Sequence, residues 1–266
     1  MSAGRPARPG SLSRREAIRG YAYISPWLAG FVVFTLGPIL ASAYLSLTNY
    51  QILAPPRFVG LANYARALGS DEVFWRAVYN TTYYAAIFVP TSIAGSLLAA
   101  LLLNARVRGQ AAFRTMFCIP SITPAVASIL IWIWGAVGGS TMIIFLAGLQ
   151  GIPAELHEAS RIDGANGWQE FVNVTLPMPS PALFFNLIVG LIGAFRVFTA
   201  AFVATGGGPM YSTMFYMLYL FNNAFLYPHM GFASALAWLF VALVFVLVVI
   251  QVWMARRWVY YEGGEK

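Results

Sequence analysis

The chain has 266 residues, of which 59% are hydrophobic and only 9% are charged. Soluble domains carry about 25% charged residues, so this composition excludes a water-soluble globular protein. A net charge of +7 would suit nucleic acid, but the charges cluster in short stretches beside apolar runs, which is typical of membrane topology. One cysteine, Cys118, and two distant histidines, His157 and His229, exclude an internal disulfide and a zinc site.

Residues 1–20 are rich in arginine and are followed by an apolar run that has no charge until Arg57. A secretory signal peptide has an apolar core of only about 7–15 residues, so we interpret this run as a retained first span from Tyr21 to Leu47. Residues 1–20 are then a cytoplasmic basic segment.

Further uncharged stretches cover residues 77–105, 115–154, 171–195 and 197–255. A transmembrane helix needs about 20 apolar residues, and the last two stretches predict spans at Pro181–Ala204 and Gly231–Met254. We therefore predict an all-α, polytopic transmembrane helix bundle of five to six spans over residues 21–254, followed by a tail at 255–266.

The positive-inside rule orients these spans. Arginines concentrate in residues 1–20, 106–114 and 256–257, whereas residues 205–230 have no Lys or Arg. The first three segments, and with them both termini, are predicted to be cytoplasmic, and residues 205–230 to lie outside. The polar stretch at 151–180 is then cytoplasmic as well.

This orientation requires residues 115–154 to cross the membrane an even number of times. As one helix, these 40 residues would extend about 60 Å, which is twice the thickness of the hydrocarbon core. As two crossings they barely suffice, because the second arm, Thr141–Ile152, would be only about 18 Å long. We predict a short hairpin that turns near Gly138, not a single crossing.

The polar stretch 153–177 has the pattern of two short helices with a bend. Pro153 suits a helix start, Gly164 can end a helix in a left-handed turn, and Trp168 begins a second apolar face. Apolar residues recur at a spacing of three between these points, at Leu156, Ala159 and Ile162. From these residues alone, an ordinary amphipathic surface helix is the favoured interpretation.

The run Glu158-Ala159-Ser160-Arg161-Ile162-Asp163-Gly164-Ala165, followed by Leu176-Pro177 and Pro181, closely resembles the "EAA" loop of ABC importer permeases. Other stretches, in the same order along the chain, are similar to the first-type permease subunit of carbohydrate-uptake ABC importers, the class of the maltose and glycerol-phosphate systems. They are Phe34-Thr35-Leu36-Gly37-Pro38, Phe58-Val59-Gly60-Leu61-Ala62-Asn63-Tyr64, Ile143-Ile144-Phe145-Leu146-Ala147-Gly148-Leu149-Gln150, Thr205-Gly206-Gly207-Gly208-Pro209 and Arg256-Arg257-Trp258-Val259-Tyr260-Tyr261.

The resemblance implies a type I importer permease that forms half of a translocation pathway for a sugar or sugar-like solute in a bacterial or archaeal inner membrane. It implies a second permease subunit, two copies of a cytoplasmic ABC ATPase and an extracytoplasmic solute-binding protein as partners, and no cofactor, because the ATPase uses the ATP. Coupling to the ATPase would fall on Glu158, Ala159, Ser160, Asp163, Gly164, Ala165, Leu176 and Pro177. The chain departs from the family at Ile131–Gly139, between the third and fourth helices, where it either has a shortened hairpin or lacks a block.

Arg196 is the only charge inside a predicted span. A charge at the bilayer centre costs at least about 2.5 kcal/mol, so such a residue suggests a function. Arg196 can face a water-filled path and bind a hydroxyl or an anion, extend to the outer surface, or pair with a neighbouring subunit. The family takes substrate contacts from this helix, which implies a pathway that includes Gly190, Gly193, Ala194, Arg196 and Val197.

Two other classes of function compete with the permease. A secondary, ion-coupled transporter of small polar solutes normally needs an intramembrane acid, and none of the nine acids lies in a predicted span. An enzyme needs a nucleophile and base or a metal cluster, which the single Cys118 and the two histidines do not supply. A P-loop is excluded because the only lysine is Lys266. We expect a non-enzymatic permease, with the secondary transporter as the alternative.

Overall fold

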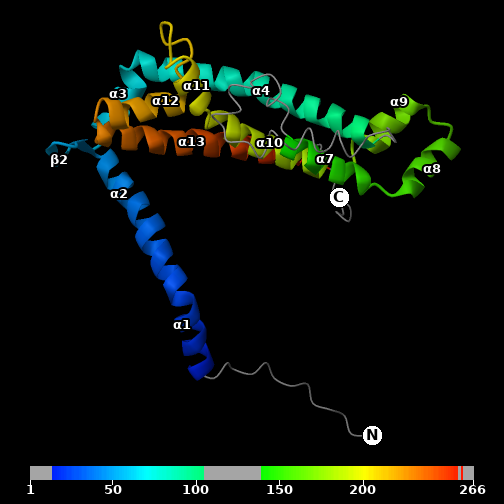
Figure 1. Cartoon of the computed structure of the whole chain (residues 1–266), viewed down its shortest axis with the longest axis horizontal. Helices are drawn as coiled ribbons and strands as arrows, with labels where there is room; N and C mark the ends of the chain where they lie inside the picture. The colour runs from blue at the N-terminus through cyan, green and yellow to red at the C-terminus, as the bar shows by residue number, and fades with distance from the viewer. Residues whose placement is uncertain (1–13, 105–138, 257–258, 260–266) are drawn as a thin grey trace.

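The computed structural model describes residues 14–104, 139–256 and 259. Within them the chain is helical apart from one short hairpin (Figure 1). Four helical stretches are long and apolar enough to cross a membrane, namely Arg19–Ser46, Glu72–Asn104, Ser180–Ala204 and Met230–Ala255. These confirm the polytopic helix bundle, with boundaries within a few residues of those predicted at each stretch except the second, which begins five residues earlier.

The first span consists of α1 (Arg14–Phe31), the π-helical segment η1 (Val32–Leu36) and α2 (Gly37–Ser46). It runs away from the other helices, so that α1 contacts none of them in Figure 1. The most apolar 18-residue stretch of this span has none of its residues buried. Only the end of α2 joins the bundle, where it packs against α13.

A two-stranded antiparallel hairpin, β1 (Thr48–Gln51) and β2 (Ala54–Phe58), follows the first span, and the sequence had not predicted it. Thr48 pairs with Phe58 and Gln51 with Ala54, with an irregularity between Asn49 and Gln51. Pro55 and Pro56 can lie in β2 because a two-stranded sheet consists only of edge strands. The hairpin leads into α3 (Ala62–Gly69) and marks one end of the bundle, the hairpin end.

The bundle itself is built on α4 (Glu72–Asn104), α7 (Gly139–Gln150), α10 (Ser180–Phe195) and α13 (Met230–Ala255). Their buried side chains form one core, in which Phe145 of α7 and Phe195 of α10 are fully enclosed. The smaller helices α11 (Thr199–Ala204) and α12 (Tyr216–Phe221) form a second core with α3, α4 and α13, and η3 (Asn222–Leu226) directly follows α12.

The predicted hairpin over residues 115–154 lies largely outside the described residues. Only its second arm is described, as the 12-residue helix α7, which at 1.5 Å per residue is about 18 Å long. This helix packs against α4 and α10. A Cβ at its Gly148 would lie 3.3 Å from the Pro179 Cβ, so the small residue allows α7 to approach the start of α10 closely.

Candidate functional site

The polar stretch 153–177, here called the coupling loop, lies at the end of the bundle opposite the hairpin (Figure 1). Its first helix, α8, spans Ala154–Ile162 and follows Pro153. The helix ends in a Schellman motif, in which the Ala165 N–H donates to the Ser160 carbonyl (3.0 Å) and the Gly164 N–H to the Arg161 carbonyl (3.1 Å). Gly164 has φ +77°, which confirms the left-handed turn predicted there.

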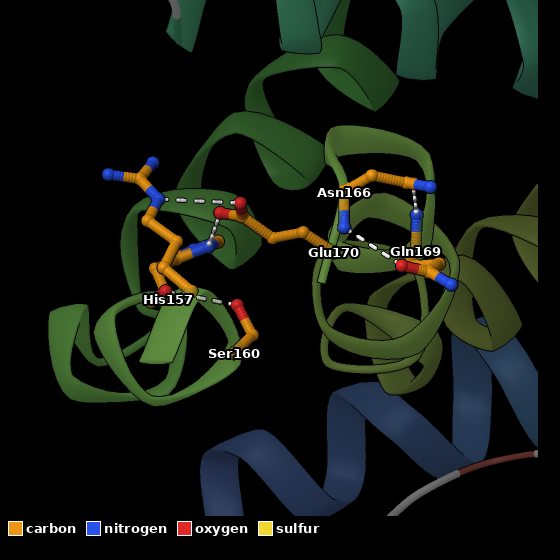
Figure 2. Close-up of polar contacts among 6 residues, drawn as sticks. His157, Ser160, Asn166, Gln169 and Glu170 are labelled. Carbon is orange, nitrogen blue, oxygen red and sulfur yellow. Dashed lines mark hydrogen bonds and ion pairs between the residues drawn. The ribbon is translucent and has the colours of Figure 1, made fainter. Parts of the chain in front are cut away.

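The second half of the coupling loop consists of α9 (Gly167–Glu170) and the π-helical η2 (Phe171–Thr175). Asn166 and Gln169 form a capping box, in which the side chain of each accepts from the backbone N–H of the other at 2.8–2.9 Å (Figure 2). The expected arrangement of two short helices with a bend is therefore present.

Three side chains tie the two halves of the coupling loop together. The Nδ1–H of His157 on α8 donates to Glu170 Oε1 on α9 at 2.7 Å, and Arg161 Nε lies 3.5 Å from Glu170 Oε2 (Figure 2). The hydrogen bond from His157 lowers the pKa of Glu170 by more than burial raises it, and the charge of Arg161 lowers it further, so that this pKa lies below its ordinary value. The carboxylate of Glu170 thus connects the two helices on either side of the bend.

The rest of the coupling loop is turned away from its own chain. None of the residues of α8 is buried, and the large apolar side chains Ile162 and Trp168 are 85% and 72% exposed. Of the eight residues expected to couple, Glu158, Ala159, Asp163 and Gly164 are exposed, and Ser160, Ala165, Leu176 and Pro177 are half-buried. A two-helix surface that leaves apolar groups and carboxylates exposed suits contact with another protein.

The contacts of Glu170 with His157 and Arg161 could not be predicted from the sequence. His157 and Glu170 are 13 residues apart and belong to different helices, so no helical spacing links them. Only the Gly164 turn brings them together, and the sequence predicted the turn without its angle.

The span Pro181–Ala204 was predicted as one helix, whereas the structure breaks it at Arg196–Phe198, between α10 and α11. Arg196 caps α10, and its N–H donates to the Ile192 and Gly193 carbonyls at 3.2 and 3.1 Å. Residues 196–198 include no proline or glycine, so the local sequence did not predict this break in the helix.

The structure separates the five pathway candidates into two groups. Gly190 faces α4, because a Cβ there would lie 3.4 Å from Val89 Cγ1, and Ala194 is buried in the core. Gly193 and Arg196 are exposed, and Val197 lines a hollow of about 570 Å³. The other lining residues of this hollow come from three segments; they are Tyr84, Ala200, Ala201, Ala204, Thr205, Thr213 and Phe215. No group of side chains suited to a metal ion occurs among the described residues.

Comparison with known proteins places these features in context. Residues 67–260 match the family described as "Binding-protein-dependent transport system inner membrane component". The chain is 36% identical to the probable ABC transporter permease protein YesP of Bacillus subtilis (strain 168), over 95% of both chains. It is 32% identical to the lactose transport system permease protein LacF of Rhizobium radiobacter, over 93% of this chain and 97% of LacF.

Among solved structures, the fold is similar to that of a bacterial ABC transporter involved in the import of the acidic polysaccharide alginate. The TM-score is 0.73 at 19% identity, over 91% of this chain and 96% of that chain.

The alignment with YesP also bears on the length of the chain. It runs over 294 positions, whereas 95% of 266 residues is about 253 residues, so the chain lacks about forty aligned positions. An internal shortening is what the sequence predicts near residues 131–139.

Proposed function

The chain belongs to the family of binding-protein-dependent transport system inner membrane components, and from this we propose that it forms half of the translocation pathway of an ABC importer for a sugar or sugar-like solute. A second permease subunit forms the other half, and two copies of a cytoplasmic ABC ATPase supply the energy. An extracytoplasmic solute-binding protein delivers the solute. The chain itself neither hydrolyses ATP nor needs a cofactor.

The coupling loop is the observation that carries this proposal. It presents Ile162 and Trp168 to a partner and keeps its two helices at a fixed angle through Glu170. Because Glu170 joins α9 to His157 and Arg161 of α8, the two helices would pass a displacement of the ATPase surface on to α7 and α10, which flank the loop in the chain. The proposal places the loop and both termini in the cytoplasm, as the arginine distribution predicts.

Names of relatives support a sugar as the cargo. LacF is described as a lactose permease, and a relative from Thermococcus litoralis, 32% identical over 92% of this chain, is described as a trehalose/maltose permease. A secondary transporter is not favoured, because the described spans contain no acid beyond Glu72, the first residue of α4, to bind a coupling ion.

The test uses the chain co-expressed with its partner permease and ATPase. We expect Glu158→Arg to abolish co-purification of the ATPase and ATP-dependent sugar uptake, because it reverses the charge on the exposed face of α8. Glu155→Arg, on the same helix but outside the EAA-like run, is the matched control. Unchanged ATPase binding and uptake in Glu158→Arg, or robust ATP hydrolysis by the purified chain alone, would refute the proposal.

A further inference from the structure

The loop that follows α11, residues 205–213 and here called the side loop, projects from the bundle. In Figure 1 it is the golden loop that rises beyond the outline of the helices near α11, on the side opposite to the one from which the first span leaves. It directly follows the membrane-crossing stretch Ser180–Ala204. The side loop therefore extends across the axis of the bundle, and any protein that it meets lies alongside the bundle.

Two consecutive residues of the side loop have a backbone conformation that side chains disfavour. Met210 has a φ of +50° and Tyr211 a φ of +60°, both in the left-handed region. Such strain persists only where the surrounding contacts impose it, and it concentrates at binding and catalytic sites. Two adjacent strained residues therefore suggest a binding role for the loop.

Hydrogen bonds within the side loop and from α4 impose its shape. Asn80 of α4 donates from Nδ2 to the Tyr211 carbonyl at 2.8 Å. The Thr213 hydroxyl donates to the Gly208 carbonyl at 2.8 Å, and it lies 2.7 Å from the hydroxyl of Thr205. The two ends of the side loop are thus joined to each other, and its middle is joined to a membrane helix.

The side loop presents an apolar tip. Met210 is 87% exposed and Tyr211 is 51% exposed. Methionine and tyrosine are enriched in the buried centres of protein interfaces. A lipid surface adapts to any apolar shape and requires no particular backbone geometry, whereas a protein pocket does. The strained tip therefore fits a protein better than it fits lipid.

The hollow of about 570 Å³ lies directly beside the side loop. Thr205 and Thr213 of the loop line it, together with Ala200 and Ala204 on the exposed side of α11. Of the described residues, eight line the hollow, and none of them is charged. The same side of the molecule thus carries an apolar projection and, next to it, a largely apolar recess.

We propose that the side loop and the hollow form the docking surface for the second permease subunit. Met210 and Tyr211 enter a pocket of that subunit, and its own corresponding loop enters the hollow. This inference rests on the proposed function, in which a second permease of the same fold completes the pathway.

Symmetry favours this occupant over the solute-binding protein. Subunits related by a two-fold axis use the same patch on both sides, so a projection on one subunit meets a recess on the other. A projection and a recess side by side on one chain satisfy that requirement. An extracytoplasmic binding protein would instead approach the end of the bundle from outside, whereas the side loop points across the bundle axis.

The test places a photo-crosslinking amino acid, p-benzoylphenylalanine, at single positions in the complex of both permeases and the ATPase in nanodiscs, with and without the binding protein. Mass spectrometry identifies the products. We expect positions 210 and 204 each to be linked to the second permease, whether or not the binding protein is present. Position 53 is the control, because Leu53 is apolar and 96% exposed but lies in the hairpin.

Linkage of position 210 to the solute-binding protein or to lipid, and not to the second permease, would overturn the inference. Equal yields of the permease product at positions 210 and 53 would overturn it as well.

Substitutions test the projection separately from the shape of its backbone. Met210→Gly removes the side chain but can adopt a φ of +50°, so the loop and the melting temperature of the chain should be preserved. We expect it to weaken the association of the two permeases in detergent at least about tenfold, as the loss of a buried anchor does. Leu53→Gly should leave the association unchanged. Native-like association in Met210→Gly would contradict the proposal.

The recess is tested from α11. Ala204→Phe fills the hollow and should also weaken the association of the two permeases, whereas Val203→Phe, on the same helix but outside the lining, should not. An equal effect of the two variants would show that the hollow receives no part of the second subunit.

Failure of this inference is distinguishable from failure of the proposed function. If the complex assembles and supports ATP-dependent uptake while positions 210 and 204 give no product with the second permease, the docking surface is wrong and the function stands. If the chain associates with no second permease and supports no uptake, the proposed function fails, and the inference fails with it.

Discussion

At the hairpin end of the bundle, Asn63 and Tyr216 find hydrogen-bond partners inside the fold, whereas at the coupling-loop end most side chains of α8 are exposed. Asn63 is buried and donates to the Ser46 and Thr48 carbonyls at 2.8 and 2.9 Å, and the Tyr216 hydroxyl donates to the Leu236 carbonyl at 2.8 Å. In α8 no residue is buried. The hairpin end is therefore held by contacts within its own chain, whereas α8 leaves its surface exposed, as the proposed contact with an ATPase requires.

From this comparison we expect a mutation at the hairpin end to lower the stability of the fold. The tightest contact there is between β1 and Gly231 at the start of α13, where a Cβ would overlap the Thr48 carbonyl oxygen and lie 2.8 Å from the Tyr50 nitrogen. Both neighbours are backbone atoms, which cannot rotate away. We expect Gly231→Ala to lower the free energy of unfolding by about 3 kcal/mol, the upper part of the range for overpacking.

The measurement is the thermal melting of the purified chain in detergent, together with the yield of monodisperse protein. Gly30→Ala in α1 is the control, because a Cβ there has no atom within 4 Å. A melting temperature of Gly231→Ala equal to that of Gly30→Ala would show that the hairpin is not held by this contact.

At the coupling-loop end the corresponding change should harm transport and leave folding intact. Proline at position 164 cannot adopt the φ of +77° that ends α8, and it has no N–H to donate to the Arg161 carbonyl. We expect Gly164→Pro to reduce ATP-dependent uptake at least tenfold while the melting temperature of the bundle stays within a few degrees of the native value.

Gly167→Pro offers a matched control within the same loop. Gly167 is the first residue of α9, where proline is well tolerated, and Asn166 before it is extended at ψ 166°, as a residue preceding proline prefers. Uptake should stay near the native level. Equal loss of uptake in both variants would mean that the loop tolerates no proline at all, and the specific role of the Gly164 turn would be wrong.

The two ends also differ in how far the sequence could predict them. The spans follow from local hydropathy, and the turn at Gly164 follows from a glycine placed after an apolar stripe, so both could be predicted and are confirmed. The hairpin could not, because β1 and β2 show no alternating pattern and their position depends on Gly231, which is about 180 residues away. The break at Arg196 has no local signal either. Which residues bind the ATPase or the solute stays a prediction.

The smallest expected effect concerns Glu170 and the order of the coupling loop. Its side chain is 16% exposed and its pKa is lowered in the folded loop, chiefly by the hydrogen bond from His157. A carboxyl with a lowered pKa contributes stability above its unfolded-state pKa, about 4.3, and loses it as the pH falls through the lower folded-state value.

Hydrogen exchange at residues 157–175, corrected for the intrinsic effect of pH, should therefore be constant between pH 7 and 5 and faster below about 4, while α13 stays protected. Glu170→Gln should exchange faster than the native chain between pH 7 and 5, because the neutral amide lacks the charge that attracts Arg161, and the two should converge below about pH 4, where the native carboxyl is neutral as well. Glu155→Gln, outside these contacts, should behave as the native chain does. If Glu170→Gln and the native chain exchange equally at pH 7, then the Gly164 turn and the Asn166 capping box alone hold the two helices at their angle, and the Glu170 carboxylate does not stabilise the loop.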